Sequence, residues 1–269
     1  MTGPLKTIAA MRVIRSVGLL CVLRLHMTPA EATTVVIIRT PQEVVIAADS
    51  AATIRGGGLS ATRRTVCKIY QADTSLFFAV SGLVNDPQTG FDIPTIVASS
   101  SREGDSVAAK LARVEREVQT AVLRELPNVK ERDPAGYAKL INSKGAVTVA
   151  LVGVDAGAPV ATSFSLGLAL SPKGAIETTI IRDSCPGNCP SGVRAFWFGE
   201  GDAIDRLRAA GGLPELDMPA LARYLFQVEI DAGAPSVGGP VDVLRILPGG
   251  PIWVQKKPDC PVTMKVGAK

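Results

Sequence analysis

The stretch that decides the fold is TTVVIIRTPQEVVIAADS, residues 33–50. Two runs rich in β-branched residues, 33–40 and 43–50, flank the turn residues Pro41 and Gln42. Runs of this kind separated by a short turn are typical of a β-hairpin. The stretch therefore predicts two paired strands, and it places an acidic residue, Asp49, where the second strand gives way to a turn.

The residues before this hairpin have the composition of a cleavable leader. Arg12 and Arg15 precede the short apolar run SVGLLCVLRL, and the segment ends in Ala30-Glu31-Ala32. A basic start, a short apolar run and an Ala-x-Ala end are features of a secretory signal. We therefore expect residues 1–32 to be a cleavable leader and the mature protein to be secreted or periplasmic. A cytoplasmic protein whose leader is a propeptide is the alternative.

Composition indicates one globular domain and excludes several kinds of chemistry. The chain has 269 residues and a formal net charge of only +4, which gives no reason to expect nucleic acid as a partner. Its single histidine, His26, lies in the expected leader. A Ser-His-Asp triad, a Cys-His pair and a His-ligated metal are then excluded from the mature chain. We expect no metal, no cofactor, and no membrane span in the mature form.

Removing the leader would leave an even number of cysteines. Cys21 would be lost, and Cys67, Cys185, Cys189 and Cys260 would remain. An even number in an exported chain permits disulfides, and a local bridge is feasible in CPGNC, residues 185–189. Four free thiols in a cytosolic protein are the alternative.

After the hairpin, groups of strands alternate with groups of helices. A Gly-rich turn leads to strands at 65–70 and 75–83, then to a helix that Asp105 can cap and Pro127 ends. This order of elements predicts an α+β fold, a four-layer αββα sandwich of two packed antiparallel sheets with helices outside, in a single domain over residues 33–269. The remaining segments are a short helix at 133–143, strands at 145–155, 159–168, 174–183 and 193–201, helices at 202–211 and 218–233, and strands at 241–250 and 251–257.

Four pieces of the chain occur in the order found in proteasome-type β subunits, which are N-terminal-nucleophile (Ntn) hydrolases. They are TTVV, VVIAADSAAT, TVCKI and AVSGLVND, all within residues 33–86. The separations from Thr33 to Asp49 and from Lys68 to Gly82 also match that family, whereas the turn between them is a few residues longer. The chain therefore resembles the Ntn hydrolases over about a fifth of its length.

The resemblance implies a threonine-type amidohydrolase, a peptidase-like enzyme in which Thr33 becomes the first residue by cleavage after Ala32. Its hydroxyl would attack an amide and form an acyl-enzyme, with its own α-amino group as the base. That group has a pKa of about 7.7–8.0, and a nearby cation lowers it. The resemblance implies that Lys68 is this cation and that Asp49 pairs with Lys68 and orients it. It also implies that the backbone N–H of Gly82 stabilises the oxyanion.

The resemblance also assigns residues around this centre. The expected substrate contacts are Ala52, Thr53, Val80 and Val84, and the expected supporting residues are Ser50, Glu200 and Asp231. Two of these depart from the family pattern. Glu200 stands where the family has a serine, and Asp231 lies at an altered spacing from Ser236, so both departures put activity and substrate in question.

The resemblance implies a peptide or amide substrate and a homo-oligomer. The family commonly releases its threonine by autoprocessing after a glycine, whereas Ala32 favours a signal peptidase. Two alternatives remain open: a small-molecule amidase or acylase on the same fold, and a catalytically inactive exported binding domain. Glu200 favours the inactive binding domain, because a carboxylate beside the Thr33 amine would raise the pKa of that amine.

Overall fold

The computed structural model describes residues 33–54, 62–101, 106–187, 189, 193–234, 237–258 and 260. For residues 52–54 and 62–65 it describes the backbone alone. The leader predicted over residues 1–32 and the helix cap predicted at Asp105 therefore lie outside the described residues.

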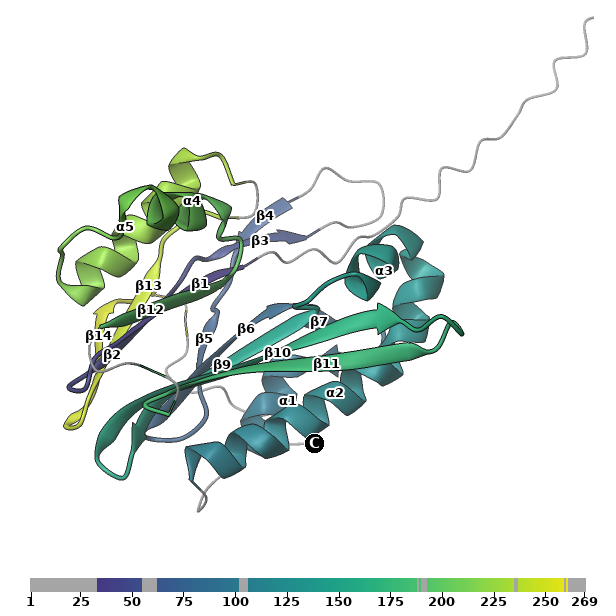
Figure 1. Cartoon of the computed structure of the whole chain (residues 1–269), viewed down its shortest axis with the longest axis horizontal. Coiled ribbons are helices and arrows are strands. Elements are labelled where there is room, and N and C mark those ends of the chain that lie inside the picture. The colour runs from purple at the N-terminus through teal and green to yellow at the C-terminus, as the bar shows by residue number, and fades with distance from the viewer. Residues whose placement is uncertain are drawn as a thin grey trace, which may run out of the picture.

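Two five-stranded antiparallel sheets lie face to face (Figure 1). In spatial order, the first sheet contains β12 (Arg194–Gly199), β1 (Thr34–Arg39), β2 (Val44–Ala48), β13 (Asp242–Leu247) and β14 (Gly250–Gln255). The second contains β11 (Ile176–Cys185), β10 (Ala158–Leu170), β9 (Val147–Asp155), β6 (Leu76–Gly82) and β5 (Ile69–Gln71). Two short hairpins pair β3 (Ala51–Ile54) with β4 (Thr62–Thr65), and β7 (Asn85–Asp86) with β8 (Phe91–Asp92).

Helices cover both outer faces of the pair of sheets (Figure 1). The second sheet is covered by α1 (Ile93–Ser100), α2 (Val107–Arg132) and α3 (Pro134–Ile141). The first sheet is covered by α4 (Asp202–Gly211) and α5 (Met218–Asp231). The predicted four-layer αββα sandwich is thus confirmed. No helix in the described part of the chain is long and apolar enough to cross a membrane.

The β1–β2 hairpin is buried on both of its faces. Val35 and Ile37 point into the core between the sheets, whereas Val36 and Ile38 pack against α4 and α5. A strand covered on both sides needs apolar residues at every position, which explains the unbroken β-branched run. At the turn, Thr40 Oγ1 accepts hydrogen bonds from the backbone N–H groups of residues 42 and 43.

α2 is longer than the sequence predicted, because it passes through Pro127 and continues to Arg132. A proline inside a helix costs about 3 kcal/mol. Leu126 and Val129, on either side of Pro127, are buried in the core, and each such burial contributes about 1.5–3 kcal/mol. The prediction that Pro127 ends the helix is therefore wrong. Packing of the last turns against the core offsets the backbone hydrogen bond that Pro127 cannot donate. Ser106 caps the helix by accepting from the Ala109 N–H.

The short helix α1 was not predicted. Asp92 caps it by accepting from the Thr95 N–H, and Pro94 occupies its first turn. An Asp followed closely by Pro is a signal for a helix start. Eight residues are too few to show a helical period, so the capping pair was the only available indication.

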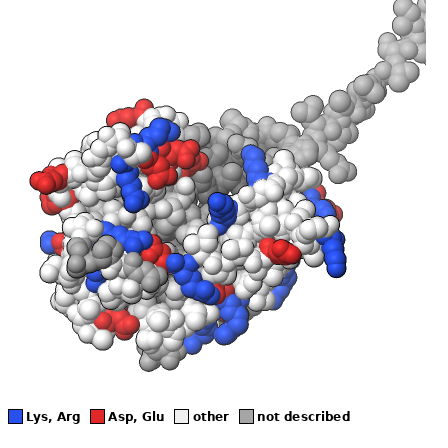
Figure 2. All heavy atoms as spheres, in the orientation of Figure 1, with Lys and Arg blue, Asp and Glu red and all other residues white. Residues whose placement is uncertain are grey.

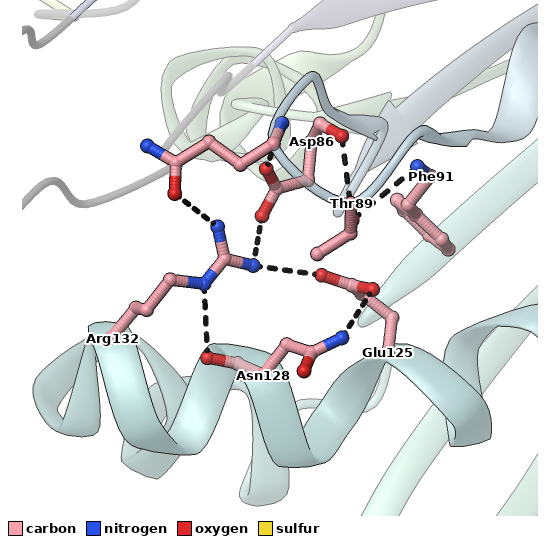
Figure 3. Close-up of polar contacts among 7 residues, drawn as sticks. Asp86, Thr89, Phe91, Glu125, Asn128 and Arg132 are labelled. Atoms are coloured by element: carbon pink, nitrogen blue, oxygen red, sulfur yellow. Dashed lines mark hydrogen bonds and ion pairs between the residues drawn. The ribbon is translucent and has the colours of Figure 1, made fainter.

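A charged cluster joins the end of α2 to β7 and the turn after it (Figure 3). The Arg132 guanidinium donates to the carboxylates of Asp86 and Glu125 and to the side-chain oxygen of Gln88. Its hydrogen bond holds the pKa of Asp86 below the ordinary value of 3.8, against the opposing effect of burial. The cluster thereby anchors β7, which begins at Asn85.

Replacing Arg132 with glutamine is expected to lower the free energy of unfolding at neutral pH by about 1–3 kcal/mol, because the partly buried Asp86 and the buried Glu125 lose a charged donor. The pKa of Asp86 is lowered in the folded state, so its contribution is present above pH 3.8 and is lost as the pH falls through the folded-state pKa. Denaturant unfolding at several pH values should therefore show the two proteins converging below pH 3.8.

Arg116→Gln is the matched control for this change. Arg116 pairs with Glu117 on the surface, where their side chains are 69% and 49% exposed. Loss of such a pair should change stability by less than about 0.5 kcal/mol at any pH. A constant difference between Arg132→Gln and wild type across the acid range would contradict the assignment of the effect to Asp86.

Candidate active site

Thr33, Asp49 and Lys68 are brought close by the hairpin and the segment that follows it. Thr33 directly precedes β1, Asp49 directly follows β2, and Lys68 lies between β4 and β5. Because β1 and β2 are antiparallel, the start of one lies beside the end of the other, and the Asp49 N–H donates to the Thr34 carbonyl. All three side chains are buried, with exposed fractions of 2%, 0% and 4% for the residues.

The Lys68 ammonium is held by Asp49. Lys68 Nζ lies 2.8 Å from Asp49 Oδ1 and donates to the Ala51 carbonyl at 2.7 Å. The Asp49 carboxyl also accepts from the N–H groups of Thr34, Ala51 and Gly238 at 3.1–3.3 Å. These partners are all donors, which fits an ionised carboxylate. Burial raises the pKa of Asp49 above 3.8, and Lys68 with the N–H donors limits that rise.

A cavity of about 170 Å³ lies beside Thr33. A cavity of similar size in another protein accommodates a benzene-sized group. Lys68 and two of the predicted substrate contacts, Val80 and Val84, line it together with Thr33. Three further lining residues were missed from the sequence: Val66, Tyr70 and Asn85.

The two-residue alternation of side chains along an extended segment could have identified two of the missed residues, Val66 and Tyr70. Side chains two apart on an extended segment point to the same side, so Val66 and Tyr70 share the side of Lys68. Asn85 carries no such signal, since its place depends on the turn after β6 and on the Arg132 cluster that anchors it. Tyr70 is itself fixed by stacking on Phe78, with ring centroids 5.1 Å apart.

Gly82 is the last residue of β6 and adopts a left-handed backbone, with φ of +94°. It lies opposite Val147, and the next residue, Leu83, donates its N–H to the Ala146 carbonyl. In an antiparallel ladder this pattern points the Gly82 N–H away from β9, toward the side where β5 lies. A Cβ at this position would lie 2.2 Å from the Ala146 oxygen, so only glycine fits. Gly82 is not among the cavity-lining residues, although Val80 and Val84 on either side are.

Ser50 packs beside the same centre without lining the cavity. Its backbone N–H donates to the Gly238 carbonyl, and its buried hydroxyl has no hydrogen-bond partner among the described residues. A Cβ on Gly239 would lie 2.5 Å from Ser50 Oγ. Gly238 and Gly239 thus bring the segment after α5 against Asp49 and Ser50, whereas Ser236 lies outside the described residues.

Glu200 reaches this region through its backbone. It lies in the turn between β12 and α4, and its carbonyl accepts from Thr34 Oγ1 at 2.7 Å. Its neighbour Gly199 lies so close to Thr33 that an added Cβ would be 1.4 Å from the Thr33 carbonyl oxygen. The turn therefore packs directly against the residue predicted to be the nucleophile.

The structure does not bring Asp231 to this centre. Asp231 is the last residue of α5, is exposed, and accepts from Gln227 of the same helix at 2.7 Å. The buried face of α5 includes Leu225 and Phe226, which leaves Asp231 facing solvent. Gly238, seven residues further along, provides the contact to Asp49 instead.

Ala52 and Thr53 lie on β3, where they are opposite Arg64 and Arg63 of β4. Their backbone follows directly from Ala51, whose carbonyl accepts from Lys68. This places the β3 backbone at the edge of the centre, while the side chains of Ala52 and Thr53 lie outside the described part of the structure.

Lys68 and Asp49 supply the charge beside the cavity. The described residues contain no group of three His, Cys, Asp or Glu side chains that could hold a metal ion. Figure 2 shows acidic and basic side chains interspersed on the face drawn, without a large area of one sign. The Lys68–Asp49 pair is thus the main charged feature beside the cavity.

Residues 30–126 match the family described as Proteasome subunit. The matched region contains Thr33, Asp49, Lys68 and Gly82, and it supports a hydrolase of the Ntn peptidase type. A comparison with curated proteins found no match. The chain is therefore proteasome-like: it has the αββα sandwich, and residues 30–126 match the proteasome subunits in sequence.

Proposed function

We propose that this protein is a threonine-type Ntn amidohydrolase that acts as a peptidase through Thr33. The observation that carries the proposal is that Thr33 and Lys68 line one cavity while Asp49 holds the Lys68 ammonium in place. A fixed cation beside a hydroxyl nucleophile and its own amine is what this chemistry requires.

The reaction has two acyl-transfer steps. The Thr33 amine takes the proton from the Thr33 hydroxyl, and Oγ1 attacks the carbonyl carbon of the substrate. The C–N bond breaks, the leaving amine receives the proton, and an ester to Thr33 remains. Water then attacks this ester and gives a proton to the amine, the ester bond breaks, and the hydroxyl is restored. The Lys68 cation lowers the pKa of the amine, and the Gly82 N–H stabilises the oxyanion.

This reaction needs a free α-amino group on Thr33. If residue 32 stayed attached, the nitrogen would be an amide and could not act as a base. We propose that the leader directs the chain to a secreted or periplasmic location and that its cleavage after Ala32 creates the amine. If the nitrogen of residue 33 stayed an amide, the chain would keep this fold but would lack the base that the reaction needs.

The cavity suggests a small or medium-sized apolar side chain on the acyl side of the scissile bond. Val66, Val80 and Val84 provide aliphatic walls, and Tyr70 adds an aromatic one. Asn85 is the one uncharged polar side chain among the lining residues besides Thr33 and Tyr70. An acylated small amine could occupy the same space, which keeps an amidase or acylase as the second candidate. We further propose a homo-oligomer.

Labelling with a threonine-directed electrophile tests the proposal. The natural protein is purified, its N-terminus is sequenced, and it is treated with a peptide epoxyketone or β-lactone before mass spectrometry. We expect a chain that begins at Thr33 and one adduct on that residue, with Thr33→Ala as the negative control. Peptide amides and acylated amines then compete with the label to rank the substrate classes. A Thr33 N-terminus that acquires no adduct would favour the inactive binding domain.

A further inference from the structure

Lys257 and Cys260, which follow β14, hold residues 66–68, the stretch that carries Lys68. Lys257 forms a buried ion pair with Asp242 at 2.8 Å, and the two side chains are only 3% and 2% exposed. Lys257 Nζ also donates to the Val66 carbonyl at 2.7 Å, and the Lys257 N–H donates to Asp242 Oδ1 at 2.8 Å. One buried ammonium therefore joins β13 to the residue two positions before Lys68.

A disulfide reinforces this grip. Cys67, between Val66 and Lys68, is bonded to Cys260, with 5.5 Å between the two Cα atoms. Cys260 is buried, its N–H donates to the Lys257 carbonyl, and its sulfur lies 3.8 Å from Asp242 Oδ2. We call the four residues Asp242, Lys257, Cys67 and Cys260 the C-terminal clamp.

The clamp acts on a stretch that belongs to neither sheet. Residues 66–68 lie between β4 and β5, and outside the clamp the Val66 backbone is held by its N–H bond to the Ser50 carbonyl at 2.9 Å. Val66 and Lys68 both line the cavity beside Thr33. A shift of this stretch would move the cavity wall and the Lys68 ammonium together, and a misplacement of about 1 Å can cost 10²-fold in rate.

We propose that the C-terminal clamp is a positioning device for Lys68 and that the oxidised chain is the active form. This inference rests on the proposed function. A dithiol reductant would transfer two electrons and two protons, breaking the Cys67–Cys260 bond into two thiols while the dithiol becomes a cyclic disulfide. The Val66 backbone would then keep its bonds to Lys257 and Ser50, and the Lys68 side chain its bonds to Asp49 and Ala51, but the backbone between them would lose its covalent anchor, so the position of the ammonium would become less fixed.

The first test replaces the disulfide in the full mature chain. Cys67→Ser/Cys260→Ser is compared with Cys185→Ser/Cys189→Ser, which removes the other disulfide, a local bridge four residues apart at the end of β11. After a cooperative thermal transition is confirmed, the rate of Thr33 labelling is measured from pH 5 to 9. We expect at least a tenfold loss and a higher pH midpoint for the first variant only, because the amine loses its neighbouring cation. Equal rates and midpoints in both variants would overturn the inference.

The second test uses the ion pair and a readout that does not need activity. Asp242→Asn/Lys257→Met removes the grip on Val66 without leaving one buried charge alone. Hydrogen exchange of peptides covering residues 66–71 should rise in both clamp variants and remain unchanged in the Cys185 control. If wild type acquires no label, the proposed function fails, and unchanged exchange at 66–71 would then refute the clamp separately.

Discussion

Replacing Lys68 with methionine is expected to slow labelling of Thr33 by about 10²–10⁴-fold, the range typical for loss of assisted proton transfer. The Lys68 ammonium is 2.8 Å from Asp49, and Lys68 lines the cavity with Thr33. Methionine keeps most of the length of the side chain and removes the charge. Without the cation the pKa of the Thr33 amine rises, and the pH midpoint of labelling should move upward. Rates of labelling across pH 5 to 9 measure both effects.

Stability is expected to fall in the same variant. Asp49 would remain buried without its cation, and breaking a buried pair in this way costs about 3–5 kcal/mol. Asp49→Asn/Lys68→Met removes both charges and should recover much of that loss without recovering the rate of labelling. Denaturant unfolding of the single and double variants separates a folding defect from a defect in chemistry.

Lys110→Met is the matched control for Lys68→Met. Lys110 lies on α2 and pairs with Asp73 at 2.7 Å, with its side chain 8% exposed. This variant also breaks an ion pair of a largely buried lysine, but neither partner lines the cavity. It should lose stability and keep both the rate and the pH midpoint of labelling. A similar loss of rate in both variants would show that Lys68 acts through stability alone.

Replacing Gly199 with alanine is expected to displace Thr33. The new Cβ would lie 1.4 Å from the Thr33 carbonyl oxygen, which belongs to backbone and cannot swing aside. Gly199 also has φ of +89°, so alanine adds conformational strain. Strain and overpacking together should cost roughly 2–5 kcal/mol, and labelling should fall by about 10²-fold or more. Denaturant unfolding and the labelling rate are the measurements.

Gly157→Ala separates the two causes. Gly157 has a similar φ of +80°, and a Cβ there would meet no atom within 4 Å. Alanine at 157 therefore imposes the backbone strain of about 1–2 kcal/mol without the clash, and labelling should be unaffected. Equal losses at positions 157 and 199 would contradict the proposed contact between the Glu200 turn and Thr33.

Local pattern determined a large part of the architecture. The β-branched runs on either side of Pro41 became β1 and β2, because a strand buried on both faces needs apolar side chains at every position. The order of strand groups and helix groups predicted the four layers. The tight hairpin puts Thr33, before β1, beside Asp49, after β2, whereas the resemblance to Ntn hydrolases predicted that Lys68 joins them. The role of each residue stays a prediction.

Only the tertiary structure decided which distant residues join this centre. Asp231 lies on the solvent side of α5, Pro127 lies within a helix that packing sustains, and Cys67 is bonded to Cys260, 193 residues away. A periodic pattern reports which face of an element is buried, but not which element covers that face. Contacts such as Gly238 with Asp49 and Lys257 with Val66 form when the layers pack, so they depend on the assembled fold and leave no local signal in the sequence.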